Sequence, residues 1–103
     1  MPHFVAFLRP ARPTFPGDAT SVELAVVDNH FQHLQQLLSQ GVLVLAGRTD
    51  EAEPVGLVIL ETKDMAAARH LLDADPAIAS GLFKARLAPY HLALLRSATP
   101  PAV

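Results

Sequence analysis

The spacing of apolar and polar positions along the chain predicts the order strand, helix, strand, strand, helix, strand. The first strand is expected over residues 3–9, a short run of apolar and aromatic side chains that ends at Pro10. Residues 10–20 contain three prolines and a glycine, so a loop should follow. A loop of this length is long for so small a domain, and long loops often carry function.

The first helix is expected to begin at Ser21. Thr20 and Glu23 have the spacing of a capping box, in which each side chain bonds a free backbone N–H of the first turn. Apolar residues then recur at steps of three and four, and they form one narrow stripe at about 100° per residue. The stripe that should face the core consists of Leu24, Val27, Phe31, Leu34 and Leu38. Gly41 is expected to end this helix.

Two further strands are expected over residues 42–48 and 55–62, joined as a hairpin by the acidic turn at 49–54. Asp64 should cap a second helix that runs to Leu72 or Asp73.

Asp75-Pro76 has the pattern of a new helix start, with an acidic cap followed by proline, and it opens one short turn that ends at Gly81. The last strand is expected from Phe83 to Leu95, and Pro89 within it favours an edge position. This order predicts one α+β domain over residues 1–96, the ferredoxin-like βαββαβ sandwich with a four-stranded antiparallel sheet. Residues 97–103 are expected to form a flexible tail.

Three of the strands are apolar at both odd and even positions, whereas a sheet with one wet face should alternate. These apolar runs are residues 4–8, 42–46 and, apart from Gly56, 55–60. Because two helices can cover only one face, we expect a second copy of the chain to cover the other face in a homodimer. The alternative is an exposed apolar face that binds a ligand or another protein.

Composition narrows the function classes. Of the 103 residues 17% are charged, the net charge is −2, and the eight lysines and arginines are scattered, so neither nucleic acid nor an anionic membrane surface is an expected partner. The absence of cysteine excludes disulfides and thiolate metal sites. The apolar runs are too short to span a bilayer, and residues 1–4 do not resemble the start of a signal peptide, so we expect a cytoplasmic protein.

The common nucleotide-binding and nucleophile motifs are absent, and we expect no cofactor and no metal. Histidines are then the main candidates for chemistry. If the helix stripe is centred on Phe31 and Leu38, His30 lies about 80° to one side and His33 about 140° away. His33 should then be mostly solvated. His30 should be half-buried on the flank, either lining a pocket or acting only as a boundary residue.

Asp75 allows two interpretations that do not exclude each other. It can cap the helix that Pro76 opens, and a carboxylate can cap with one oxygen while accepting from an imidazole with the other. A metal site built from His30, His33 and Asp28 is conceivable but disfavoured by the outward direction expected for His33.

The remaining polar residues offer weaker alternatives. Arg9 and Arg12 flank the proline-rich loop and could hold an anionic substrate, although solvated arginines are more common. The other histidines are expected to be structural, in a strand for His3 and His91 and on a helix surface for His70.

The segment Asn29-His30-Phe31-Gln32-His33-Leu34-Gln35-Gln36-Leu37 is followed by the glycine-bounded apolar strand at 41–47. Together with Ala74-Asp75-Pro76-Ala77 and the nearby Gly81-Leu82-Phe83, it resembles the YCII-related family over roughly residues 3–92. This resemblance implies a dimeric α+β barrel of ferredoxin-like subunits. It also implies a His/Asp active site, which falls on His30 and Asp75, because His33 occupies a position that is usually apolar or aromatic in the family.

Two positions depart from the family pattern. Gly47 is followed by Arg48 where the family often has proline, and Asp75-Pro76 is followed by Ala77 where it often has phenylalanine. Both changes alter the shape and charge of a pocket, so a substrate cannot be transferred by resemblance.

Members of the family and its fold relatives with known chemistry are small-molecule lyases or isomerases. They imply hydrogen halide elimination from chlorinated hydroxyquinols, or lactone isomerisation. Our hypothesis is a cofactor-independent enzyme acting on a cyclic or aromatic, oxygenated metabolite. His30 would move the proton, since the ordinary pKa of an imidazole is about 6.5, and Asp75 would fix its tautomer. The alternatives are a non-catalytic ligand-binding or interaction module, and a structural dimer without any pocket.

Overall fold

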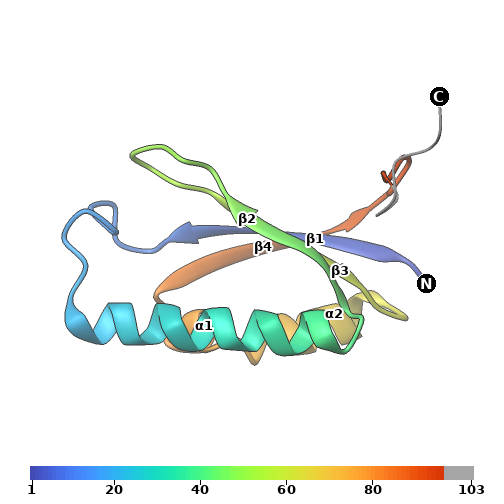
Figure 1. Ribbon diagram of the computed structural model, residues 1–103, viewed down its shortest axis with the longest axis horizontal. Helices are drawn as coiled ribbons and strands as arrows, with labels where there is room; N and C mark the ends of the chain where they lie inside the picture. The colour runs from blue at the N-terminus through green and yellow to red at the C-terminus, as the bar shows by residue number, and fades with distance from the viewer. Residues whose placement is uncertain (97–103) are drawn as a thin grey trace.

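The computed structural model describes residues 1–96, and within them the expected α+β order is confirmed, with one short extra helix (Figure 1). The strands and helices are β1 (His3–Pro10), α1 (Ser21–Ser39), β2 (Leu43–Arg48), β3 (Gly56–Glu61), α2 (Met65–Asp73), α3 (Pro76–Ala79) and β4 (Phe83–Tyr90). The tail predicted for residues 97–103 lies outside the described residues. None of the helices in residues 1–96 is long and apolar enough to cross a bilayer.

The four strands form one antiparallel sheet in the order β2-β3-β1-β4, and α1 and α2 lie against one of its faces (Figure 1). This is the ferredoxin-like arrangement that the element order predicts. Pro89 lies on β4, an edge strand of this sheet, where a missing backbone N–H is tolerated.

The last strand ends at Tyr90, earlier than the predicted end at Leu95. Its length is set by its neighbour, because Tyr90 pairs with His3 at the very start of β1 and no partner strand continues beyond that point. The prediction that His91 lies in a strand is therefore wrong, and this residue is exposed after β4.

Helix α1 begins where the capping box predicts. The Glu23 N–H donates to Thr20 Oγ1 at 3.1 Å, and the Thr20 N–H donates to Glu23 Oε1 at 2.9 Å. At the other end, Gly41 adopts a φ of 76°, a left-handed conformation that favours glycine after a helix.

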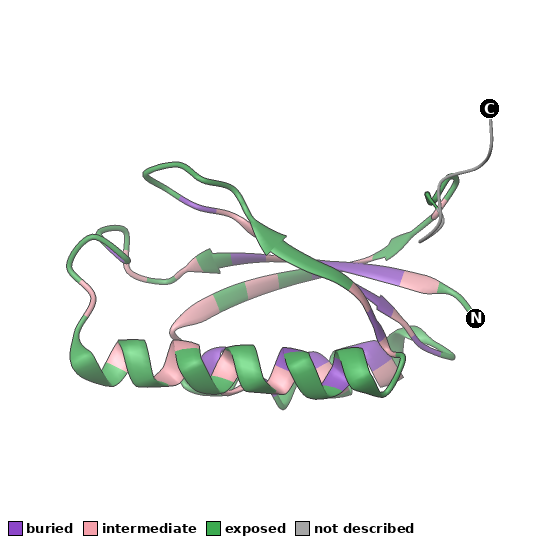
Figure 2. Ribbon diagram, in the orientation of Figure 1, coloured by how far each residue is buried: buried purple, intermediate pink, exposed green. Residues whose placement is uncertain are grey.

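The side of α1 that faces the core differs from the predicted stripe. Leu34 and Leu37 are buried, whereas Leu24, Phe31 and Leu38 are 53%, 61% and 58% exposed. In Figure 2 much of the helix is correspondingly coloured as exposed. The three exposed residues lie about 100° around the helix axis from His30, which is on the inward side of the helix. The buried side is therefore centred well away from the stripe that the sequence predicts.

The reason for this rotation is that the inward side of α1 includes two polar residues. His30 and His33 both hydrogen-bond to the segment that spans α2 and α3, and their desolvation is compensated there. Apolar periodicity counts only apolar side chains, so it shifts the expected centre toward Phe31.

The core lies between the sheet and the helices. Its buried members come from every strand and from α1 and α2: Phe4, Ala6, Leu8, Leu34, Leu37, Leu43, Val58, Leu60, Ala68, Leu72 and Leu87.

The opposite face of the sheet is apolar at its centre and charged along β4. Val5 pairs with Ile59 in register, and both are only 4% exposed within a single chain. The next pair on this face is Phe7 with Leu57, and the guanidinium of Arg86 lies 4.8 Å from the centre of the Phe7 ring. The apolar character expected on both faces therefore holds for β1 and β3. The homodimer itself stays a prediction.

Candidate functional site

His30 and Asp75, which are 45 positions apart in the sequence, meet beneath the sheet. His30 projects from α1, and Asp75 lies between α2 and α3. His30 Nδ1 and Asp75 Oδ2 are 2.6 Å apart, a short charge-assisted hydrogen bond. The sequence resemblance pointed to this pair, and the fold brings the two side chains into direct contact.

Asp75 also caps α3, so both interpretations of this residue hold structurally. Its Oδ1 accepts the Ala77 N–H at 2.9 Å, and Pro76 occupies the first turn, where its missing N–H costs nothing. The residue is only 1% exposed. Both carboxylate oxygens accept hydrogen bonds, which satisfies a charge that would otherwise be costly to bury.

The hydrogen bond to Asp75 determines which nitrogen of His30 is available. An ionised carboxylate oxygen only accepts, so this contact favours the tautomer of His30 that carries its proton on Nδ1. Nε2 has no hydrogen-bond partner among the described residues. The His30 side chain is 14% exposed, so this nitrogen can meet a small molecule.

Phe83, the first residue of β4, supports the imidazole from one side. Its ring meets His30 edge-on, with centroids 5.5 Å apart and planes at 88°. Phe15 from the loop before α1 packs on Phe83 in turn, with centroids 5.8 Å apart. These contacts restrict the orientation of His30.

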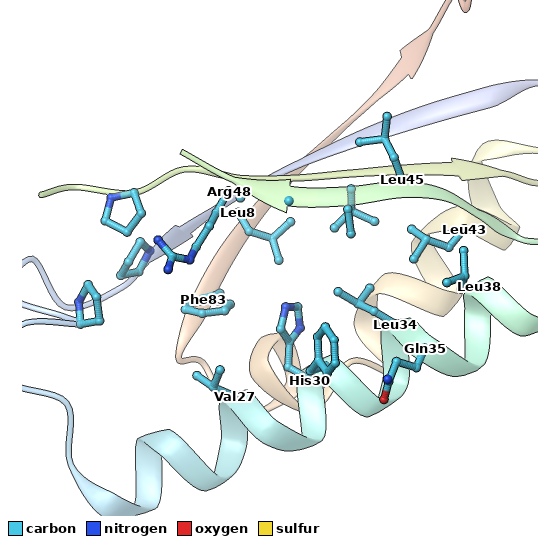
Figure 3. Close-up of a pocket in the computed structure, with 18 of the residues that line it drawn as sticks. Leu8, Val27, His30, Leu34, Gln35, Leu38, Leu43, Leu45, Arg48 and Phe83 are labelled. Carbon is cyan, nitrogen blue, oxygen red and sulfur yellow. The ribbon is translucent and has the colours of Figure 1, made fainter. Parts of the chain in front are cut away.

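A cavity of about 780 Å³ lies between α1 and the sheet, next to this imidazole (Figure 3). This volume is within the range of small-molecule sites. Its lining is mostly apolar and includes the exposed helix residues Leu24, Phe31 and Leu38. Within the part of the chain that the structure describes, His30 and Arg48 are the ionisable side chains that line it. The α1 residues that were predicted to face the core but are exposed therefore form one wall of the cavity.

The proline-rich loop supplies another wall and is held in place by Arg12. Phe15 of this loop is buried and lines the cavity. The Arg12 guanidinium binds the carboxylates of Asp18 and Glu23, with Nη2 2.5 Å from Glu23 Oε1, and it also donates to Thr14 Oγ1 at 2.9 Å. Arg12 is thus engaged within the protein, contrary to the alternative that it holds an anionic substrate.

These contacts shift the ionisation of all three groups. The hydrogen bond from Arg12 is the main cause that lowers the pKa of Asp18 and of Glu23 below their ordinary values. In return the bonds to Glu23 and then to Asp18 raise the pKa of Arg12.

His33 is half-buried, and the prediction that it is mostly solvated is wrong. Its Nε2 lies 3.0 Å from the carbonyl oxygen of Leu71 in α2, so it ties the two helices together. Asp28 is exposed. Among residues 1–96 there is no cluster of three side chains able to hold a metal ion, so the disfavoured combination of His30, His33 and Asp28 is not such a cluster.

Phe83 and Arg48 line the cavity, although the sequence did not predict them as site residues. The sequence marks Phe83 as the start of the last strand and part of the Gly81-Leu82-Phe83 segment, and it marks Arg48 as the end of a strand and a departure from the family pattern. The sequence signal for both is their place at a strand terminus, Phe83 at the start of β4 and Arg48 at the end of β2, where side chains next to a loop reach past the sheet.

The fold and the site define a ferredoxin-like α+β protein with an imidazole–carboxylate pair beside an apolar cavity. The chain belongs to the YCII-related domain family, whose model matches residues 4–88. No curated protein sequence matches the chain.

Among solved structures, the chain is similar to 5-chloro-2-hydroxyhydroquinone dehydrochlorinase (TftG) from Burkholderia phenoliruptrix AC1100, in complex with 2,5-dihydroxybenzoquinone. The TM-score is 0.57 at 19% sequence identity, and the alignment covers 85% of this chain and 93% of the other. At this identity the likeness shows a shared fold.

Proposed function

We propose that the protein is a lyase or isomerase that acts, without a cofactor, on a cyclic or aromatic, oxygenated small molecule. The observation that carries the proposal is the contact between His30 and Asp75, which leaves Nε2 of the imidazole open beside a cavity of ligand size.

In the proposed reaction His30 is the general base and then the general acid. With Nδ1–H donating to Asp75, the lone pair of Nε2 takes a proton from a hydroxyl group or from a carbon next to a carbonyl. The electron pair left behind forms a new C=O or C=C bond. In an elimination a halide leaves with its bonding pair, and in an isomerisation the proton returns from Nε2 to another atom.

Asp75 would stabilise the imidazolium that forms and hold the ring in this tautomer. Because the carboxylate is buried and fixed by Ala77, little reorganisation is needed when the charge appears. Proton transfer of this kind contributes about 10²–10⁴ in rate, and the shape of the cavity must supply the remainder.

The similarity to TftG supports the substrate class without identifying a substrate. That protein is named for dehydrochlorination of a chlorinated hydroxyhydroquinone, and it was solved with 2,5-dihydroxybenzoquinone. A single oxygenated ring of this kind fits a cavity of about 780 Å³ lined mostly by apolar side chains.

The test is a turnover screen of halogenated hydroquinols, quinones and lactones with the wild-type protein and His30→Asn. We expect turnover of at least one compound class, and a loss of about 10²–10⁴ in the variant. His70→Asn is the matched control, because His70 is exposed on α2, away from the cavity, and this variant should keep full activity. Unchanged turnover in His30→Asn would eliminate the proposed role.

A second candidate is a ligand-binding module without catalysis. It is favoured by the lining of the cavity, which is almost entirely apolar and offers few groups besides His30 to stabilise a transition state. Tight binding of a compound from the screen, with no turnover of any of them, would select this alternative.

We also propose that two copies associate through the sheet face that the helices leave open. Support comes from the large apolar side chains that this face leaves exposed, since Leu45 is 42% and Tyr90 41% exposed. The side chain of Leu45 points away from the helices in Figure 3.

A further inference from the structure

Among residues 1–96, Arg48 is the one permanently charged side chain that lines the cavity. It stands at the end of β2, and in Figure 3 its side chain runs from the strand to the side of the cavity where Phe83 lies, while His30 lines the same cavity from α1. The lining residues carry no carboxylate, since Asp75 lies behind His30 and outside the lining. A ligand in the cavity therefore meets one fixed positive charge.

The guanidinium of Arg48 is available for a ligand. Its described hydrogen bond is a long one, from Nη1 to the Thr49 carbonyl oxygen at 3.5 Å. No acidic side chain of residues 1–96 forms an ion pair with it, although the following turn carries several exposed acids, namely Asp50, Glu51 and Glu53. Arg12 shows the contrast, because two carboxylates of its own chain already occupy that guanidinium.

The surroundings of Arg48 suit an anion on a flat ring. A guanidinium presents several N–H donors in one plane, which match the oxygens of a carboxylate or phenolate. Apolar residues such as Leu8 and Phe83 border the same space and exclude water from one side of such a contact. A neutral quinone or lactone would not form an ion pair with the Arg48 guanidinium.

We propose that Arg48 selects substrates that carry an anionic oxygen group on a planar ring, an aromatic carboxylate or an acidic phenolate. The anionic group binds the guanidinium at the β2 end of the cavity, the ring lies on the apolar lining, and the reacting position faces Nε2 of His30. This inference rests on the proposed function and narrows its substrate class.

The experiment compares 2-naphthoate with 2-naphthamide, two ligands of one shape that differ in charge, by calorimetric or NMR titration. The wild-type protein should bind the carboxylate about tenfold more tightly than the amide, a difference expected for a half-exposed charge-assisted contact. In Arg48→Gln the two ligands should bind within about twofold of each other, because the amide contact changes little while the ion pair is lost.

The matched control is Arg69→Gln, which removes the same charge from the exposed surface of α2 and should keep the preference for naphthoate. The inference is overturned if the preference survives in Arg48→Gln, or if it falls equally in Arg69→Gln through the overall charge. It is also overturned if neither ligand binds the wild type. A preference lost only in His30→Asn would assign the selection to the imidazole instead.

These outcomes are separate from the fate of the catalytic proposal. If the wild-type protein shows no preference for the carboxylate, the proposed role of Arg48 fails, but this result does not contradict turnover. Turnover of neutral substrates that depends on His30 would likewise support the catalytic proposal and remove the role of Arg48.

Discussion

Asp75 combines a structural task with a proposed chemical one because its two oxygens face different donors. Oδ1 accepts the Ala77 N–H and starts α3, and Oδ2 meets Nδ1 of His30. Either contact alone explains a buried acid at this position, so mutation to alanine cannot tell them apart. An asparagine can, since it caps helices almost as well as aspartate.

We predict that Asp75→Asn stays folded but loses activity. The asparagine oxygen can still cap α3, so the free energy of unfolding should fall by no more than about 1 kcal/mol. Its amide would donate to Nδ1 and force the proton of His30 onto Nε2, which should lower turnover by about 10²–10⁴.

Asp75→Ala is the companion variant. It removes the cap and leaves His30 without its partner, so it should cost about 1–3 kcal/mol of unfolding free energy as well as the activity. Chemical denaturation and turnover assays measure the two effects separately. Full turnover in Asp75→Asn would show that the carboxylate serves only as a cap.

At the scale of single residues, the sequence predicted the contact between His30 and Asp75 better than it predicted the environment of neighbouring residues such as His33. The cap at Asp75 follows from the Asp-Pro pattern, and the choice of His30 over His33 came from helix geometry together with the family resemblance. The half-burial of His33 could not be predicted, because it depends on the Leu71 carbonyl oxygen of another helix, a partner that no periodicity in α1 reveals.

Among the elements, α1 shows most clearly how packing overrides a pattern. The sequence correctly predicts where this helix begins and ends, since the capping box and Gly41 are local signals. The orientation of α1 about its own axis depends on the elements that it packs against. The apolar residues that the pattern assigned to the core therefore line the cavity instead. An apolar stripe on a helix can therefore mark a ligand wall as well as a packed interface.

The loop before α1 is the second element that shapes the cavity, and its fixation depends on pH. Because the pKa values of Asp18 and Glu23 are lowered in the folded state, mainly by Arg12, their contribution to stability is present above the ordinary carboxyl pKa. It is lost as the pH falls through the lowered values, that is, below about pH 4.

We therefore predict that Arg12→Met lowers the melting temperature at pH 6 and has a smaller effect at pH 3. Thermal unfolding followed by circular dichroism at both pH values measures this. Arg69→Met, which removes a weaker exposed pair with Asp73 at 3.7 Å, is the control and should show little effect at either pH. An Arg12→Met effect of equal size at both pH values would show that the carboxylates do not fix the loop.

For the whole molecule, the element order was sufficient to predict the fold, because few topologies accommodate βαββαβ in one small domain. The end of β4 was not predictable from its own residues, since it depends on how far β1 extends alongside it. The cavity could likewise not be predicted from the sequence, because it is the space left between α1, the proline-rich loop and the sheet. The cytoplasmic location stays a prediction.

The homodimer is tested at this scale. Light scattering should give twice the mass of one chain at micromolar concentration, and Leu45→Lys should produce monomers by placing a charge on the proposed interface. Met65→Lys is the matched control, because Met65 is exposed to a similar degree, 38%, but lies in the helix layer. A wild-type protein that is monomeric under these conditions would refute the dimer.

The central claim is that Asp75 holds the proton of His30 on Nδ1 and leaves Nε2 as the base that faces the cavity. Long-range ¹H–¹⁵N NMR of the ligand-free protein reads this directly, since the two nitrogens of a neutral imidazole differ according to which one is protonated. The account predicts the Nδ1–H form of His30 in the wild-type protein and the Nε2–H form in Asp75→Asn. A wild-type His30 with its proton on Nε2 would contradict it.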